Sequence, residues 1–248
     1  MRLDVLLGEA LPTPADVAGR AVVVIDVLRA STVMIEALAQ GARAVIPFAE
    51  VEDVMIAAKQ YGRDEVRLAG ERRSRAIAGF DAGNSPRDMT AALVRGRTVL
   101  MTTTNGTHAL VATQGAWRTW VGAIRNLSTT AAAVAAALRE GRDATLVCAG
   151  QDRRFALEDA VCAGAMVRLV REQCPEVVLG DAARVVAQLA GAYEADWLAV
   201  ARDASHARTL ASEGFADDVP FCLERDATPM RALYVDRVVT GERVLDPA

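Results

Sequence analysis

The sequence predicts an α/β protein with a three-layer α/β/α arrangement, a largely parallel or mixed sheet and a helical C-terminal part. Three observations predict it. Short apolar runs alternate with helical patterns through the first 150 residues. These runs are apolar throughout, as expected for strands of a parallel sheet whose two faces are both covered. Beyond residue 155 helical patterns dominate.

The elements follow one another in a regular order along the chain. Strands are predicted over residues 21–27, 43–47, 66–69, 98–102 and 144–148, with a weaker candidate near 117–121. Helices are predicted between them over 32–40, 51–61, 87–95 and 129–140. Each of these helices is followed by a glycine, the expected stop signal of a helix. Further helices are expected over 157–171, 182–202 and 207–213, then a β-like tail over 232–239 and a short apolar pair at 244–245.

The domain organisation follows from what separates these elements. No linker rich in proline, glycine or serine divides the 248 residues. We therefore expect a single compact domain over 1–248. Two interleaved subdomains remain an alternative, one α/β over about 1–150 and one mainly helical over 151–248.

Composition excludes several classes of function. No apolar run reaches the roughly 18 residues of a membrane span, so no membrane is expected as a partner. The net charge is −4 and no basic block is present, so nucleic acid is not an expected partner either. The four cysteines form no Cys-x-x-Cys pair and no secretory signal is visible, which predicts reduced thiols in a cytoplasmic protein. With only two histidines, a metal is expected to be hard and oxygen-bound, such as Mg²⁺.

The most informative segment joins the strand over 21–27 to the next helix. Asp26 ends the apolar run, and Arg29, Ser31 and Thr32 follow at the expected helix start. Ligands of α/β sheets bind outside the carboxyl ends of the strands, and a helix N-terminus favours anions. Asp26 is therefore a candidate magnesium ligand or phosphate-attacking nucleophile, with Arg29 as a clamp for an acidic group. The structural alternative is a capping aspartate and a surface arginine.

Two further polar segments lie near predicted strand ends. The segment after residue 102 contains Thr103, Thr104, Asn105, Gly106 and Thr107, where glycine allows close backbone approach or a positive φ. A plain Asn-Gly turn is the alternative. The other segment is a polar loop that contains Asp81, Asn84 and Ser85 and forms part of a helix start. With residues 70–73, Arg72 among them, this loop is a candidate substrate-facing flap.

The last candidate segment surrounds residues 148–159. Cys148 ends a strand, and Glu158 and Asp159 lie in the first turn of the next helix. The two acids complement the helix dipole, and they are also suitable magnesium ligands. Cys148 and Arg154 have the Cys-x5-Arg spacing of cysteine phosphatases, but the loop between them is acidic, and a buried thiol is the commoner case. We interpret His108 and His206 as polar residues without a catalytic role.

Taken together, these motifs resemble the 2-phosphosulfolactate phosphatase family. The match rests on the following segments: Ile25-Asp26-Val27-Leu28-Arg29-Ala30-Ser31-Thr32, Gly70-Glu71-Arg72, Gly79-Phe80-Asp81, Gly83-Asn84-Ser85-Pro86, Thr102-Thr103-Thr104-Asn105-Gly106-Thr107, Cys148-Ala149-Gly150, Leu157-Glu158-Asp159 and Ala163-Gly164. A weaker match continues through Asp218-Val219, Cys222, Asp226 and Pro229. The segments occur in order over nearly the whole chain.

The resemblance implies a magnesium-dependent phosphatase that converts 2-phosphosulfolactate into sulfolactate and phosphate. In methanogens that step belongs to coenzyme M synthesis. From the chemistry of the residues we expect catalysis by Asp26 and Arg29, and Mg²⁺ held by Asp26 with Glu158 or Asp159. The substrate would be bound by hydroxyls, amides and other side chains of the same segments: Ser31, Thr32, Arg72, Asp81, Asn84, Ser85, Thr103, Thr104, Asn105, Gly106, Thr107 and Cys148.

Other functions remain open at this point. The expected partner is a small anionic phosphoester, and a homodimer is left open. A phosphatase for another small phosphoester, such as phosphoglycolate or phospholactate, is the second hypothesis. A non-catalytic anion-binding protein is the third.

Overall fold

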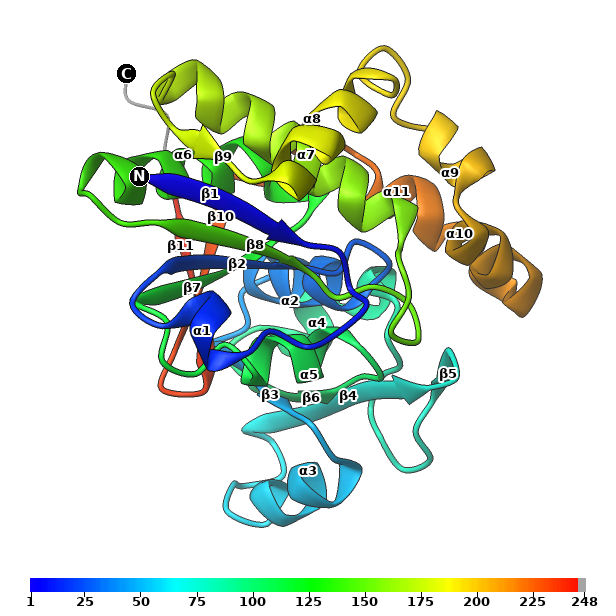
Figure 1. Ribbon diagram of the computed structural model, residues 1–248. Coiled ribbons are helices and arrows are strands. Elements are labelled where there is room, and N and C mark those ends of the chain that lie inside the picture. The colour runs from blue at the N-terminus through cyan, green and yellow to red at the C-terminus, as the bar shows by residue number, and fades with distance from the viewer. Residues whose placement is uncertain (245–248) are drawn as a thin grey trace.

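The chain builds one mixed sheet of eleven strands, seen in the computed structural model, which describes residues 1–244 (Figure 1). In chain order the strands are β1 (Arg2–Leu6), β2 (Ala21–Ile25), β3 (Ala44–Phe48), β4 (Val66–Arg72), β5 (Arg75–Ala76), β6 (Thr98–Thr102), β7 (Arg118–Gly122), β8 (Ala144–Cys148), β9 (Val178–Leu179), β10 (Met230–Val235) and β11 (Val238–Arg243). Their order across the sheet is β5-β4-β6-β3-β11-β10-β7-β2-β8-β1-β9. The predicted fold class is confirmed.

The sheet consists of two parallel halves joined by an antiparallel hairpin. Strands β4, β6 and β3 are parallel to one another, and so are β7, β2, β8, β1 and β9. The hairpin β10–β11 lies between the halves and pairs antiparallel with β7 and β3. The β-like tail predicted over 232–239 is confirmed as strand, but the turn within it was not predicted. Asp236 and Arg237, both at positive φ, form a tight turn that divides it into two strands.

Helices cover both faces of the sheet, because strand β2 is apolar on both sides. Val23 and Ile25 pack into one core with α6 (Leu127–Arg139) and α7 (Leu157–Gln173). Val22 and Val24 point to the opposite face and pack into a second core with α2 (Ala30–Ala39). The alternation follows from the two-residue period of a strand. The other helices over the sheet are α1 (Pro14–Val17), α3 (Val51–Ala58), α4 (Ala91–Val94), α5 (Gly106–Val111) and α8 (Asp181–Gly191).

Three predicted helices are shorter than expected. The helix over 51–61 ends at Ala58, and the one over 87–95 divides into a 3₁₀ turn (Pro86–Asp88) and α4, with Thr90 accepting the Leu93 amide as its cap. The helix over 182–202 breaks after Gly191 and resumes as α9 (Ala199–Asp203). These segments lack the long buried face that would stabilise a continuous helix.

The first strand of the chain was not predicted, and one predicted segment near the C-terminus cannot be compared with the structure. The strand β1 pairs with β8 and β9 in the sheet, although no strand was predicted there. The pair predicted at 244–245 extends outside the described residues. No helix within residues 1–244 is long and apolar enough to cross a membrane.

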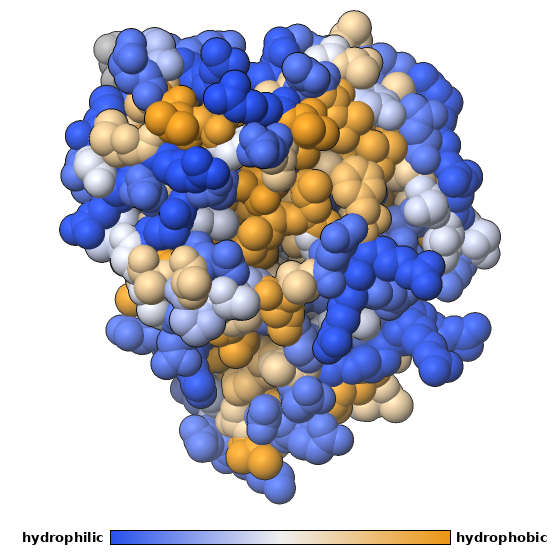
Figure 2. All heavy atoms as spheres, in the orientation of Figure 1, coloured by the Kyte–Doolittle hydropathy of each residue, from blue (hydrophilic) through white to orange (hydrophobic). Residues whose placement is uncertain are grey.

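The C-terminal helices gather at the edge of the sheet where the parallel strands end. Helices α9, α10 (Ser205–Leu210) and α11 (Asp218–Cys222), with a π-helical turn over Ala211–Phe215, lie at the right in Figure 1. The short hairpin β4–β5 lies on the same side, and Figure 2 shows hydrophilic residues gathered over this lower right region. The C-terminal helices and the β4–β5 hairpin thus lie on the same side of the molecule as the ends of the parallel strands.

Candidate active site

Asp26 is fixed at the end of β2 by the first turn of α2. Its Oδ1 accepts the Ala30 amide at 3.1 Å, and its own amide donates to Ser31 Oγ at 3.0 Å. Only 5% of Asp26 is exposed. Burial raises the pKa of its carboxyl group to about 6, with Glu158 and Glu71 adding to the rise and His206 and the Ala30 amide opposing it. The carboxylate form still predominates at neutral pH.

Gly106 allows the triple-threonine loop to approach Asp26 closely. A Cβ atom at position 106 would lie 2.5 Å from Asp26 Oδ2 and 2.6 Å from Ala30 Cβ. The residue has no positive φ, so of the two reasons expected for a glycine here, close approach applies. Behind it, Thr103 and Thr107 bond to each other through hydroxyl and backbone groups, including Thr103 N to Thr107 Oγ1 at 3.0 Å.

Arg29 is a buried, paired arginine. Its Nη1 lies 2.7 Å from Asp218 Oδ2 on α11, and the two side chains are 2% and 3% exposed. The guanidinium also stacks on the Phe215 ring at 4.1 Å. Asp218 Oδ1 accepts the Ser85 hydroxyl at 2.8 Å, so one carboxylate holds both residues. The alternative of a surface arginine is therefore wrong.

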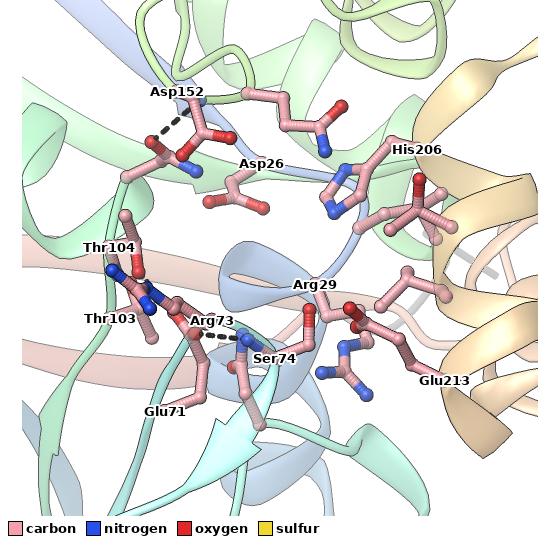
Figure 3. A pocket seen from close by; sticks show the side chains of 16 residues that line it. Asp26, Arg29, Glu71, Arg73, Ser74, Thr103, Thr104, Asp152, His206 and Glu213 are labelled. Atoms are coloured by element: carbon pink, nitrogen blue, oxygen red, sulfur yellow. Dashed lines mark hydrogen bonds between the residues drawn. The ribbon is translucent and has the colours of Figure 1, made fainter.

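Asp26 and Arg29 line a cavity of about 210 Å³ (Figure 3). Six of the predicted site residues line it: Asp26, Arg29, Asn84, Thr103, Thr104 and Asn105. Ten residues that were not assigned to the site also line it: Leu28, Glu71, Arg73, Ser74, Gln151, Asp152, His206, Thr209, Leu210 and Glu213. The lining is rich in hydroxyl and amide groups, which can donate hydrogen bonds to a phosphate.

The other predicted site residues do not line this cavity. Four of them make hydrogen bonds within the protein: Ser31, Thr32, Asp81 and Ser85. For example, Thr32 Oγ1 donates to the Val27 carbonyl at 2.8 Å, and Asp81 Oδ2 accepts the Leu68 amide at 2.8 Å. Gly106 and Thr107 shape the loop behind Asp26. The roles proposed for these residues in binding substrate stay predictions.

Arg72 and Cys148 line a second cavity of about 470 Å³, behind Thr104 and Asn105. The Arg72 side chain donates to Ala49 O at 3.2 Å and to Thr102 Oγ1 at 3.1 Å. Burial, with the charge of Asp159 adding, raises the pKa of the Cys148 thiol well above its usual range. A protonated, buried thiol agrees with the structural interpretation of Cys148 rather than with a cysteine phosphatase.

The acidic pair lies buried next to Asp26. Asp159 accepts two backbone amides, those of Val27 at 2.8 Å and Gly150 at 3.0 Å, and thereby joins the ends of β2 and β8. Burial, with Asp26 and Glu158 adding, raises the pKa of Asp159 well above its usual range. Glu158 Oε1 lies 3.0 Å from His206 Nδ1, while Glu158 Oε2 is buried without a hydrogen-bond partner among the described residues.

Comparison with known proteins decides the family. The model of the family described as 2-phosphosulpholactate phosphatase matches residues 8–236. The chain belongs to this family. It is 32% identical to a "Probable 2-phosphosulfolactate phosphatase" of Clostridium beijerinckii over 98% of this chain and 100% of that protein. It is 39% identical to a protein of the same name from Caldicellulosiruptor saccharolyticus, over 87% of this chain and 91% of that one. The family recognised from the motifs is confirmed, and with it the class of phosphoric monoester hydrolases.

The carboxylates of this site fit a divalent cation that is held by one or two carboxylates, with phosphate oxygens and water as the other ligands. Asp26 and Glu158 raise the pKa of Asp159, and Asp159 raises the pKa of the Cys148 thiol, so negative charge is in excess there. Glu158 Oε2 has no hydrogen-bond partner among the described residues. No group of three or more His, Cys, Asp or Glu within residues 1–244 is arranged to hold a metal by itself. Mg²⁺ is commonly bound by one or two carboxylates together with phosphate oxygens and water. The residues fit that mode.

His206 is the least expected member of the site. Its ring points toward Asp26 across the cavity in Figure 3. Burial lowers its pKa, but the hydrogen bond to Glu158 and the charges of Glu158 and Asp26 outweigh this and raise it overall. The sequence indicated no catalytic role for His206, and the structure places it in the lining of the cavity, hydrogen-bonded to Glu158. No local pattern identifies it, because it lies on α10, 180 residues after Asp26 in the sequence.

Proposed function

We propose that this protein is a magnesium-dependent phosphatase that hydrolyses 2-phosphosulfolactate to sulfolactate and phosphate. The observation that carries the proposal is the position of Asp26, a buried carboxylate that lines a polar cavity at the end of a parallel strand. Membership of the family supports the substrate. A cytoplasmic location goes with the proposal, because all four cysteines are free and buried.

Asp26 and Glu158 are the residues that would hold Mg²⁺. Asp26 lines the cavity, and Glu158 Oε2 is one of the buried oxygens that lack a hydrogen-bond partner among residues 1–244. Asp159 is less suited, since both its oxygens accept backbone amides. When bound, the ion would neutralise phosphate charge and orient the ester. A role for Asp159 in holding β2 and β8 together follows from its two hydrogen bonds.

The chain's own groups position the phosphate for attack. The hydroxyls of Thr103 and Thr104 and the amide of Asn105 line the cavity beside Asp26. In one route Asp26 attacks phosphorus, so that a P–O bond to Asp26 forms, the ester P–O bond breaks and the sulfolactate oxygen takes a proton. Water then hydrolyses the aspartyl phosphate. In the other route Asp26 would hold the ion, and water attacks phosphorus directly, the ester P–O bond breaks and the sulfolactate oxygen takes a proton.

The test is turnover of defined phosphoesters by the purified protein. We expect phosphate release from 2-phosphosulfolactate in Mg²⁺, little in EDTA, and recovery when Mg²⁺ is added back. Asp26→Asn should lower kcat by about 10³-fold or more, because the nucleophile or the metal ligand is lost. Near-normal turnover by Asp26→Asn would rule out both roles.

A substrate panel separates the competing functions. Faster turnover of phosphoglycolate or phospholactate than of 2-phosphosulfolactate would assign the protein to another small phosphoester. Tight phosphate binding without turnover of any ester would indicate an anion-binding protein. Acid quenching of a single turnover, followed by hydroxylamine trapping, separates the two routes, since only the first forms an aspartyl phosphate.

A further inference from the structure

The charges around the cavity leave one arginine without a partner. Three side chains that can carry positive charge line it: Arg29, Arg73 and His206. Arg29 is balanced by Asp218 at 2.7 Å, and His206 is paired with Glu158 at 3.0 Å. Within residues 1–244, Arg73 has no hydrogen bond or ion pair through its side chain. Of these three, its charge is the one free to meet an anionic ligand.

The β4–β5 hairpin holds Arg73 at the cavity. Arg73 and Ser74 form its two-residue turn, with φ of 54° and 61°. Such a turn favours glycine or asparagine, so other residues persist there only when neighbouring contacts fix them. The Arg72–Arg75 pair closes the hairpin below the turn.

Glu71 supplies those fixing contacts. It is buried, and its Oε2 accepts the Ser74 amide at 2.9 Å. Its Oε1 accepts both the amide and the hydroxyl of Thr104, at 2.8 and 2.9 Å. One carboxylate therefore joins the tip of the hairpin to the triple-threonine loop. Arg73 itself is exposed, so burial of its side chain does not hold the turn.

The position of Arg73 indicates which part of the substrate it meets. In Figure 3, Glu71, Arg73 and Ser74 lie across the cavity from Asp26 and His206. The phosphate has to lie toward Asp26. In 2-phosphosulfolactate the carboxylate is on the carbon that carries the phosphate ester, and the sulfonate is on the next carbon. The sulfonate is therefore the acidic group that reaches farther from Asp26.

We propose that Arg73 selects for the sulfonate of the substrate and that Glu71 is the positioning residue that holds it there. A guanidinium can donate two parallel hydrogen bonds to an oxyanion, which suits a sulfonate. This inference rests on the proposed function, because it takes the substrate from it. It assigns a specificity that Arg29 does not supply, since Arg29 is neutralised by Asp218.

The experiment compares two esters that differ only in the sulfonate, 2-phosphosulfolactate and 2-phospholactate. The wild-type protein should prefer the sulfonated ester in kcat/KM. Arg73→Gln should remove most of that preference, about tenfold or more, by raising KM for the sulfonated ester. Its kcat/KM on 2-phospholactate should fall by much less than its kcat/KM on the sulfonated ester, because 2-phospholactate has no sulfonate for Arg73 to bind. Arg73→Lys should restore part of the preference.

Arg75→Gln is the matched control. Arg75 lies on the same hairpin, is exposed and does not line the cavity. Replacing it with glutamine changes the net charge by the same amount as Arg73→Gln does. It should leave the preference intact. Glu71→Gln keeps Arg73 but places a donor amide against the N–H groups of Thr104 or Ser74. It should therefore lower the preference for the sulfonated ester. The thermal unfolding midpoint of the variant checks that it is folded. A purely structural Glu71 would lower turnover of both esters equally.

Direct binding distinguishes failure of this inference from failure of the proposed function. Calorimetry with sulfolactate and lactate needs no turnover. Loss of the wild-type preference for sulfolactate in Arg73→Gln supports the assignment even if neither ester is hydrolysed, in which case the proposed function is what fails. The assignment is overturned if Arg73→Gln keeps the preference, if Arg75→Gln loses as much of it, or if the wild-type protein shows no preference in either assay.

Discussion

At the scale of single residues, neighbours far along the chain decide what each charged group does. Arg29 follows Asp26 by three residues and is the obvious anion clamp of the sequence. In the structure, however, the Arg29 guanidinium is neutralised by Asp218, 189 residues later, in a buried ion pair. Within the described part of the chain Arg73 has no such neighbour, and we assign the free positive charge to it. Sequence spacing gives the types of residue at the site but not their charge balance.

The Arg29–Asp218 pair gives the first prediction at this scale. Asp218→Ala leaves a guanidinium buried without its counter-charge and Ser85 without its acceptor. We expect a loss of about 3–5 kcal/mol in the free energy of unfolding. Urea denaturation followed by circular dichroism measures it.

The adjacent residue provides the control for this prediction. Asp217 pairs with Arg87 at 3.0 Å, but the two side chains are 78% and 50% exposed. Asp217→Ala should therefore change the unfolding free energy by less than about 1 kcal/mol. Equal losses in the two variants would mean that the buried pair contributes no more than the exposed one.

Gly106 gives the second residue-scale prediction. Gly106→Ala places a Cβ atom against Asp26 Oδ2 and Ala30, so either the carboxylate or the threonine loop has to move. Displacement of a reacting group by about 1 Å can lower kcat by ~100-fold, and we expect a loss of that order. Gly83→Ala is the control, because its Cβ meets only Ala76, at ordinary contact distances of 3.4 Å to Cβ and 3.8 Å to Cα. A Gly106→Ala variant with wild-type kcat would show that Asp26 does not need this close approach.

At the scale of elements, close backbone contacts set how the C-terminal helices lie. Helix α7 packs along α8 with Gly164 at the crossing, where a Cβ atom would run into the carbonyl oxygen of Val186. The same helix carries Glu158 and Asp159 at its N-terminus. The crossing of α7 and α8 therefore fixes the helix that presents the acidic pair.

The element-scale prediction is that alanine has opposite effects at two helical glycines. Gly164→Ala should destabilise the protein by about 1–3 kcal/mol through overpacking, although alanine favours helix. Gly191→Ala at the end of α8 meets only Arg168 Nη1 at 3.3 Å, a side chain that can move, so it should be neutral or slightly stabilising. Thermal unfolding of the two variants measures both. A neutral Gly164→Ala would show that the helix crossing is loose.

At the scale of the whole molecule, the C-terminal part of the chain forms the middle of the sheet. The last described strands, β10 and β11, lie between the two parallel halves of the sheet. Helix α2 contacts strands of both halves and the hairpin, namely β3, β7, β10 and β11. The cavity likewise combines residues from the first half of the chain with His206, Thr209 and Glu213. We propose that the sheet and the C-terminal helices unfold as one unit.

Tryptophan fluorescence tests this proposal. Trp120 is buried in β7, and Trp197 lies in the C-terminal helical part. Variants that keep only one of the three tryptophans should report the same urea midpoint, since a cooperative domain has one transition. Circular dichroism of each variant checks that the substitutions leave the fold intact. An earlier transition at Trp197 would indicate that the C-terminal helices open as a separate subdomain.

Much of the fold could be predicted because it depends on local patterns. The β-branched run before Asp26 forms a strand buried on both faces, and the alanine-rich segment before Gly141 forms helix α6. The hairpin β10–β11 could not be placed, because antiparallel pairing in the middle of a parallel sheet depends on contacts distant in sequence. The helix breaks after Ala58 and Gly191 depend on which faces the fold leaves exposed.

The fold class, the family and the strand-end residues from Asp26 to Asn105 could be predicted from the sequence, because hydrophobic periodicity and short motifs are local properties of a chain. Which charges are paired depends on the folded arrangement. It neutralised Arg29 with Asp218, turned Arg72 away to a second cavity, and brought Arg73 and His206 to the first. Electrostatic balance depends on distances in space, and folding sets those distances between residues that the sequence keeps far apart.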